Sequence, residues 1–203
     1  MKINLKFGVK PLELNKYYIS KNQDTLQINL LKFYISKIQI QYSDKTIDSQ
    51  TNSYHLIDIE NPNSCKIPIE KITDKTISKV SFSIGVDSTA SISGALEGDL
   101  DPTKGMYWAW QSGYINMKLE GKSSSCKTRK NEFQFHIGGY MKPNYAMRKV
   151  VLEPKKSNST VEINVDVAAL FSQLELSKIN SVMVPGNQAM QIADYSVTMF
   201  KTK

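Results

Sequence analysis

The chain has 203 residues, of which 40% are hydrophobic and 22% charged, so it has an ordinary globular composition and enough length to bury one sizeable core. The 26 Lys+Arg residues outnumber the 19 Asp+Glu residues and give a net charge of +7. The lysines are scattered, however, and Arg129 and Arg148 are the only arginines. This distribution favours a solvated basic face over a nucleic-acid-binding surface.

No linker-like stretch divides the sequence, so we expect one domain over residues 1–203. No apolar run reaches the ~20 residues that span a bilayer, and the opening MKINLKFGVKPLEL has neither a signal core nor a cleavage site. We therefore expect a soluble chain, and export would require a targeting or lipid-anchor segment upstream of these residues.

Segments with period-two or β-branched sequence recur along the chain. They cover Ile3–Val9, Thr25–Ile40, Tyr54–Ile59, Ser78–Gly85, Tyr114–Glu120, Glu132–Gly138, Arg148–Leu152 and Thr160–Val167. Turn-type clusters at 43–45, 61–64 and 155–158 separate several of them. This rhythm predicts a mainly β fold, an antiparallel β-sandwich.

The apolar spacing becomes helical near the C-terminus. Ile192, Ala193, Val197 and Phe200 follow a helical period after the break at 185–187, which predicts a short C-terminal helix. A second helical turn is expected over 168–174, with Asp166 as its cap.

The stretch from Gly85 to Tyr114 has weak periodicity in its first half and concentrates both tryptophans, Trp108 and Trp110, in its second half. Long loops that carry large aromatic side chains inside a compact domain are more often functional than incidental. Core packing or the covering of a sheet edge is the structural alternative for these two indoles.

One long block carries a family resemblance. The run GDLDPTKGMYWAWQSGYINMKLEG (98–121), preceded by LKFYIS, SYHLID and FSIGVD and followed by FQFHIGGY (133–140), resembles the MbnP-like family. The resemblance implies an exported bacterial β-sandwich, periplasmic or anchored to the outer membrane as a lipoprotein. It also implies copper, Cu(I) or Cu(II), held by histidine together with a tryptophan oxidised to kynurenine by a partner dihaem cytochrome c peroxidase-like protein.

Carried over to this sequence, the resemblance makes His55 and His136 the candidate metal ligands and Trp108 or Trp110 the candidate oxidised residue. Met141, which follows the FHIGGY block, is a possible soft ligand, and Met106 and Met117 are further sulfur donors. Strand alternation turns His136 away from Phe133, Phe135 and Ile137, and it groups His55 with Ile57 and Ile59, so His55 could equally be a core histidine.

Other chemistry is less well supported. Cys65 and Cys126 could form one disulfide or remain as two free buried thiols. Asp87, Asp99 and Asp101 raise a calcium alternative, although no EF-hand spacing is present. No nucleophile elbow, HExxH, P-loop or Rossmann pattern occurs, and carboxylates such as Glu97 and Glu120 are too common to indicate a glycosidase.

Two functions are compatible with these observations. The first is an extracytoplasmic copper-binding protein, not itself an enzyme, in copper acquisition or handling. The second is a non-catalytic glycan- or protein-binding β-sandwich module whose histidines are structural.

Overall fold

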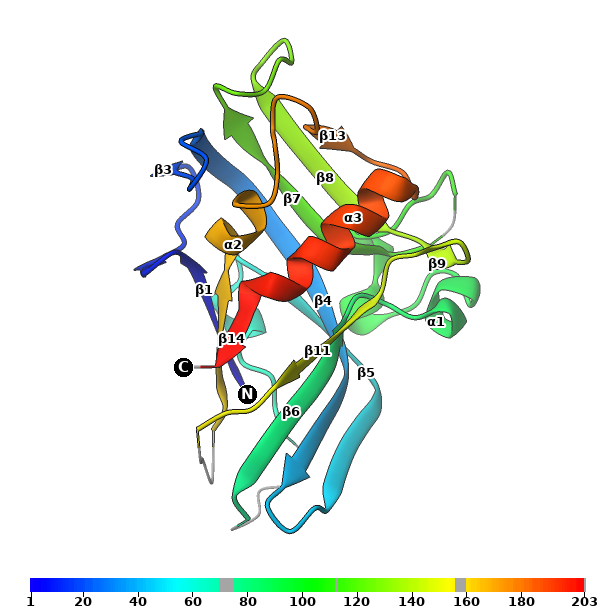
Figure 1. The fold of residues 1–203 in the computed structure, drawn as a ribbon. Coiled ribbons are helices and arrows are strands. Elements are labelled where there is room, and N and C mark those ends of the chain that lie inside the picture. Colours follow the sequence, from blue (N-terminus) through cyan, green and yellow to red (C-terminus); the bar gives the residue numbers. More distant parts are fainter. Residues whose placement is uncertain (70–74, 112, 156–159, 203) are drawn as a thin grey trace.

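The computed structural model describes residues 1–69, 75–111, 113–155 and 160–202, and it is mainly β (Figure 1). In this part of the chain the largest sheet has eight strands, and the long strand β4 (Thr25–Tyr42) lies at its centre. One edge of β4 pairs with β6 (Ile77–Ile84) and β7 (Ile115–Ser123), and the other edge pairs with β3 (Tyr17–Ile19) and β5 (Ile47–Asp58). The sheet continues from β6 to β11 (Arg148–Leu152) and from β7 through β8 (Glu132–Gly138) to β13 (Ser181–Val182).

A second sheet packs against the first and has the order β14 (Phe200–Thr202), β12 (Glu162–Asp166), β1 (Lys2–Phe7) and β2 (Lys10–Pro11). The pairings β1–β12 and β8–β13 are parallel, and the others are antiparallel. A small hairpin joins β9 (Tyr140–Met141) to β10 (Asn144–Tyr145). The sandwich prediction is therefore confirmed, with the refinement that its sheets are mixed.

The inner face of the large sheet carries the main core. Alternate β4 residues Leu31, Phe33 and Ile35 are fully buried there, and Phe200 meets Phe33 edge-on at 5.8 Å between ring centroids. The second sheet, α2 (Val167–Phe171) and α3 (Asn187–Ser196) cover this face (Figure 1). Both predicted helices are thus present, and the Asp166 carboxylate caps α2 by accepting from the Ala168 N–H at 3.1 Å.

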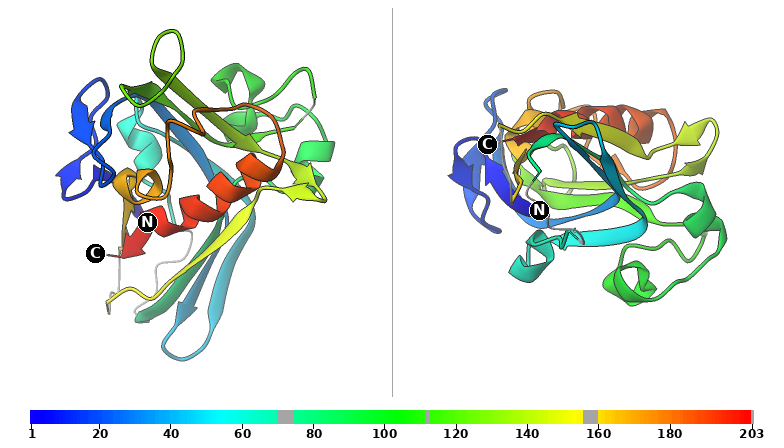
Figure 2. Two further views of the ribbon diagram at one scale, coloured as in Figure 1. Left: turned by 45° about the horizontal axis from the view of Figure 1, so that its top comes forward. Right: turned by 90° about the horizontal axis from the view of Figure 1, so that it is seen from below.

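The outer face of the same sheet has a core of its own. Residues 85–111, which we call the covering segment, fold over this face on the side away from α3 (Figure 2). The segment contains α1 (Ser88–Ile92) and the 3-10 turns η2 (Gly98–Leu100) and η3 (Pro102–Lys104). Its side chains bury Tyr34 and Leu56 of the sheet in a second cluster with Met106, Trp108 and Tyr114. Loop and sheet are therefore packed together by apolar contact.

The remaining connections are short. A third 3-10 turn, η1 (Pro62–Cys65), follows β5, and η4 (Val197–Met199) joins α3 to β14. The predicted strand segments are all present, and Thr25–Ile40 lies within one uninterrupted strand with local bulges. The predicted turn at 155–158 lies almost wholly outside the described residues. Within the described residues, no helix is both long and apolar enough to cross a membrane.

Candidate functional site

His136 lies on the outer face of β8, opposite in direction to its neighbours Phe135 and Ile137, as strand alternation predicts. Its side chain is almost completely enclosed, since the residue is only 7% exposed. The imidazole Nε2 lies 2.6 Å from Oε1 of Glu120 on the adjacent strand β7. The Lys118 ammonium lies 3.8 Å from the same carboxylate oxygen.

This contact defines the chemical state of the ring. Burial lowers the pKa of His136, and the hydrogen bond that the ring donates to the Glu120 carboxylate opposes that effect only in part. A neutral imidazole follows, and an ionised carboxylate can only accept a hydrogen bond, so the proton resides on Nε2. Nδ1 is then the ring nitrogen with a free lone pair. A carboxylate that fixes the far nitrogen of an imidazole is the arrangement that usually orients metal-ligating histidines.

Trp108 packs on the same face of β8. A Cβ atom added to Gly138 would come within 2.7 Å of Cζ3 of the Trp108 ring, so the indole lies directly over Gly138. Gly138 and His136 are two residues apart on one strand and therefore share a face at a spacing of about 7 Å. The structure thus brings Trp108 and His136 into one neighbourhood, although they are 28 positions apart in sequence.

The two tryptophans are in contact but differ in exposure. Trp108 is 6% exposed and Trp110 is 63% exposed, and their ring centroids lie 5.9 Å apart at an angle of 50°. Trp108 therefore belongs to the outer core, whereas Trp110 presents its indole to solvent. The sequence alone could not distinguish these roles.

With this geometry established, comparison with known proteins identifies the family. The family model for MbnP matches residues 1–184. The chain belongs to the MbnP family. A solved structure, MbnP from Methylosinus trichosporium, superposes with a TM-score of 0.63 at 14% sequence identity, and the match covers 90% of this chain and 81% of that chain. A likeness at this identity shows a shared fold, and comparison with curated proteins finds no match.

The structure of this MbnP-family chain does not bring its two histidines together. His55 of β5 pairs with Ile35 and shares the inner face with it, whereas His136 is on the outer face. Strand register places Asp58, Lys32, Lys118 and His136 in one row across β5, β4, β7 and β8. Asp58 and His136 are thus three strand spacings apart, roughly 14 Å, and His55 lies three residues further from this row along β5, on the opposite side of the sheet.

The three methionines that the sequence offers as sulfur ligands also lie in different parts of the fold. Met141 is 63% exposed on the β9–β10 hairpin, Met117 faces the inner core and Met106 is enclosed in the outer cluster. No group of three or more His, Cys, Asp or Glu side chains in the described residues is arranged to hold a metal ion.

Each aspartate of the calcium alternative already has a hydrogen-bond or ion-pair partner within the protein. Asp87 caps α1 through the Ala90 N–H and pairs with Lys37 at 3.0 Å. Asp99 accepts from the Leu56 N–H and pairs with Lys104 at 2.6 Å, and Asp101 caps η3 through the Thr103 N–H. Structural roles in the covering segment therefore account for all three carboxylates.

Cys65 and Cys126 are free thiols in this structure, so the disulfide that the sequence left open is not formed. Cys126 is buried, and burial raises its pKa to about 11. Cys65 is half-buried in η1, and burial raises its pKa as well.

Glu120 is the functional residue that sequence reasoning did not place. In the sequence it is only one of many carboxylates, because nothing in the chain links it to His136 sixteen positions later. A signal was nevertheless present: Lys118 and Glu120 alternate with apolar residues in one predicted strand, and His136 does so in the next. Pairing these two segments as a hairpin would have placed the three polar side chains on one face.

Proposed function

We propose that this MbnP-family protein binds copper outside the cytoplasm, in the periplasm or anchored at the outer membrane, and serves copper acquisition or handling without turning over a substrate itself. The observation that carries the proposal is the 2.6 Å contact between Nε2 of His136 and Glu120. This contact leaves a neutral imidazole whose unprotonated Nδ1 can offer its lone pair to a metal ion. Neutral imidazole is a good ligand for copper. The copper is the protein's cargo in this proposal.

The unmodified outer face offers one imidazole and an indole, and an indole nitrogen is a poor metal donor because its lone pair belongs to the aromatic system. Oxidation of an indole to kynurenine breaks the C2–C3 bond and, once formate is lost, leaves a free aryl amine and a ketone. With hydrogen peroxide as the oxidant, two equivalents each supply one oxygen atom and leave as water, and hydrolysis of the N-formyl group then consumes one water and releases formate. Trp108 is the residue we assign to this reaction, because it lies over Gly138 on the face that carries His136.

The proposed oxidant is a dihaem cytochrome c peroxidase-like partner, as the family resemblance implies. Trp108 is buried, so a partner could not reach its ring directly, whereas the neighbouring Trp110 is exposed. The docking surface for such a partner would therefore include Trp110.

A titration of copper against a competing Cu(I) chelator tests the proposal, with protein produced in the presence and absence of the peroxidase. Mature protein is expected to bind one Cu(I) tightly and His136→Ala to lose that binding, while intact-mass analysis reports whether tryptophan has become kynurenine. His55→Ala is the matched control, because the structure places His55 on the other face of the sheet. Equal copper affinity in mature His136→Ala and the parent would refute the assignment.

A second function is supported by one observation, the exposed ring of Trp110 beside Trp108. Exposed aromatic rings can stack on sugars or anchor a protein partner. If copper binding is normal in every variant but Trp110→Ala abolishes binding to a glycan array or a protein partner, the binding-module function replaces the copper function.

A further inference from the structure

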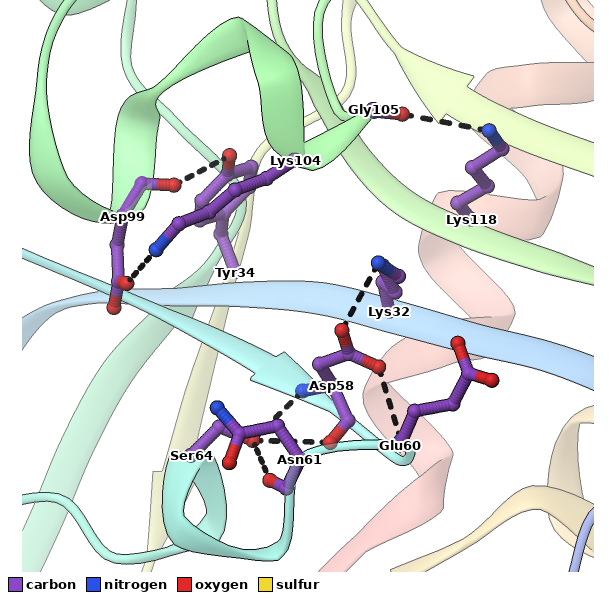
Figure 3. Close-up of polar contacts among 10 residues, drawn as sticks. All are labelled: Lys32, Tyr34, Asp58, Glu60, Asn61, Ser64, Asp99, Lys104, Gly105 and Lys118. Carbon is purple, nitrogen blue, oxygen red and sulfur yellow. Dashed lines mark hydrogen bonds and ion pairs between the residues drawn. The ribbon is translucent and has the colours of Figure 1, made fainter.

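A polar pocket of about 460 Å³ lies at the end of β5, between η1 and the turns η2 and η3. We call it the β5-edge pocket. The side chains that matter for its chemistry are Lys32, His55, Asp58, Asn61, Lys66 and Lys104, with Asp99 on the covering segment. Figure 3 shows two ion pairs of its lining, Lys32 with Asp58 at the end of β5 and Lys104 with Asp99 on the covering segment.

The two carboxylates of the pocket are fully engaged by the protein. Asp58 accepts Lys32 at 2.9 Å on one oxygen and the Glu60 N–H at 3.0 Å on the other. Asp99 likewise accepts Lys104 at 2.6 Å and the Leu56 N–H at 2.9 Å (Figure 3). The acceptors that could attract a cation are thus already used, which disfavours a metal site here.

The hydrogen-bond donors of the pocket, in contrast, do not all have a partner among the described residues. Three lysines face two aspartates, and Lys66 is exposed with no ion pair in the described part of the chain. The Asn61 side-chain oxygen accepts from the Asn63 N–H at 3.2 Å, which leaves its amide N–H₂ group as a donor.

His55 adds an independent indication of a ligand. Its Nε2 atom is buried and has no hydrogen-bond partner among the described residues. A buried polar atom without a partner destabilises the fold, so proteins rarely retain one unless something else satisfies it. With a proton on Nε2, His55 is one more donor lining the same pocket.

We propose that the β5-edge pocket binds a small oxyanion, a carboxylate or phosphate group of a free small molecule, through Lys66, Asn61 and His55. Surplus positive charge and unmatched donors suit an acceptor-rich anion. The lining contains no Phe, Tyr or Trp, the side chains on which a neutral sugar usually stacks. This site is separate from the proposed copper site. His55 lies on the opposite face of the sheet from His136, and Lys32 and Asp58 lie two and three strand spacings from His136, roughly 10 Å and 14 Å.

Amide NMR titrations with citrate and with inorganic phosphate at constant ionic strength test this inference and distinguish the two oxyanion classes. Saturable shifts confined to residues around His55, Asn61 and Lys66 are expected with at least one of the anions. Lys66→Gln should weaken that binding about tenfold, as the loss of one charge-assisted contact predicts. His55→Gln should weaken it as well.

Lys142→Gln is the matched control, because Lys142 is an exposed lysine on the β9–β10 hairpin outside the pocket. Equal affinities in Lys66→Gln and Lys142→Gln would overturn the inference. Shifts spread over lysines throughout the surface, or no saturation with either anion, would overturn it too. Cu(I) binding measured on the same Lys66 variant should be unchanged, so failure of one proposal is distinguishable from failure of the other.

Discussion

Nε2 of His136 and Oε1 of Glu120 lie 2.6 Å apart although the two residues are not directly opposite in the β7–β8 pairing. Lys118 is opposite His136, and Gln134 is opposite Glu120. The contact is therefore a diagonal one between side chains on the same face, within the reach of long side chains in antiparallel sheets. A hydrogen bond of this kind fixes the orientation of the imidazole.

Replacing Glu120 by Gln should release that orientation. A glutamine side chain can donate as well as accept, so it no longer requires the proton of His136 to be on Nε2. Nitrogen NMR of the unloaded protein should show the Nε2–H tautomer in the parent and a mixture of tautomers in Glu120→Gln. Loss of such a partner typically lowers metal affinity by about 10–100-fold, and mature Glu120→Gln should bind Cu(I) more weakly by that factor.

Glu97→Gln is the control for this experiment, because Glu97 is an exposed carboxylate at the start of η2 whose side chain makes no capping bond. The tautomer measurement requires no metal, so it tests the role of Glu120 even if copper is not the cargo. An unchanged tautomer in Glu120→Gln would show that Glu120 does not set the state of the ring.

Much of the fold could be predicted because it depends on local sequence. The outward direction of His136 follows from alternation with Phe135 and Ile137, and the C-terminal helix follows from the spacing of Ile192 and Ala193. Both features need only the period of one element. The family resemblance from the block at 98–121 was confirmed by the match to residues 1–184.

The geometry of the site could not be predicted in this way, because it depends on which strands pair. Alternation indicated that His55 faces inward, yet its separation from His136 requires the full row Asp58, Lys32, Lys118, His136 across four strands. The contact of Trp108 with Gly138 requires the covering segment to fold over the sheet, which no local period encodes.

The Trp108 ring lies where a side chain on residue 138 would be, so Gly138→Ala should displace the ring. The added methyl would lie 2.7 Å from Trp108 Cζ3 and 2.7 Å from the backbone oxygen of Tyr114, and both are closer than real contacts allow. We expect a loss of stability of about 1–3 kcal/mol and a shift in tryptophan fluorescence. Gly186→Ala, where nothing lies within 4 Å of the added carbon, is the control, and equal effects of the two substitutions would contradict the packing described here.

The two thiols should react slowly in the native protein. Because the pKa of Cys126 is raised to about 11, only about a thousandth of it is thiolate at pH 8. A disulfide-forming reagent should label half-buried Cys65 before Cys126, and both faster after unfolding. Reductant should leave the unfolding midpoint of the isolated protein unchanged, whereas a lowered midpoint would show that the two cysteines can be bridged.

His55 should make the stability of the fold depend on pH. Burial lowers the pKa of His55 below its usual 6.5, the nearby Asp99 carboxylate opposes this effect, and the amino group of Met1 adds to it. The native state therefore keeps the ring neutral at a pH where the unfolded chain already binds a proton. Since stability rises with pH wherever the unfolded state binds more protons, the contribution is complete above about pH 6.5 and is lost as the pH falls toward the native pKa.

Urea unfolding from pH 8 to pH 5 measures this contribution directly. The free energy of unfolding of the parent should fall more steeply below about pH 6.5 than above it. A shallower fall begins near pH 8, because burial also lowers the pKa of the Met1 amino group. His55→Gln removes the titrating group while keeping a polar side chain, so the fall should become shallower. It should not vanish, because burial lowers the pKa of His136 as well. If the parent and the His55→Gln variant have the same slope below pH 6.5, His55 is solvated in both the native and the unfolded state. Nε2 of His55 would then not be buried without a partner, and the proposed anion pocket would lose that support.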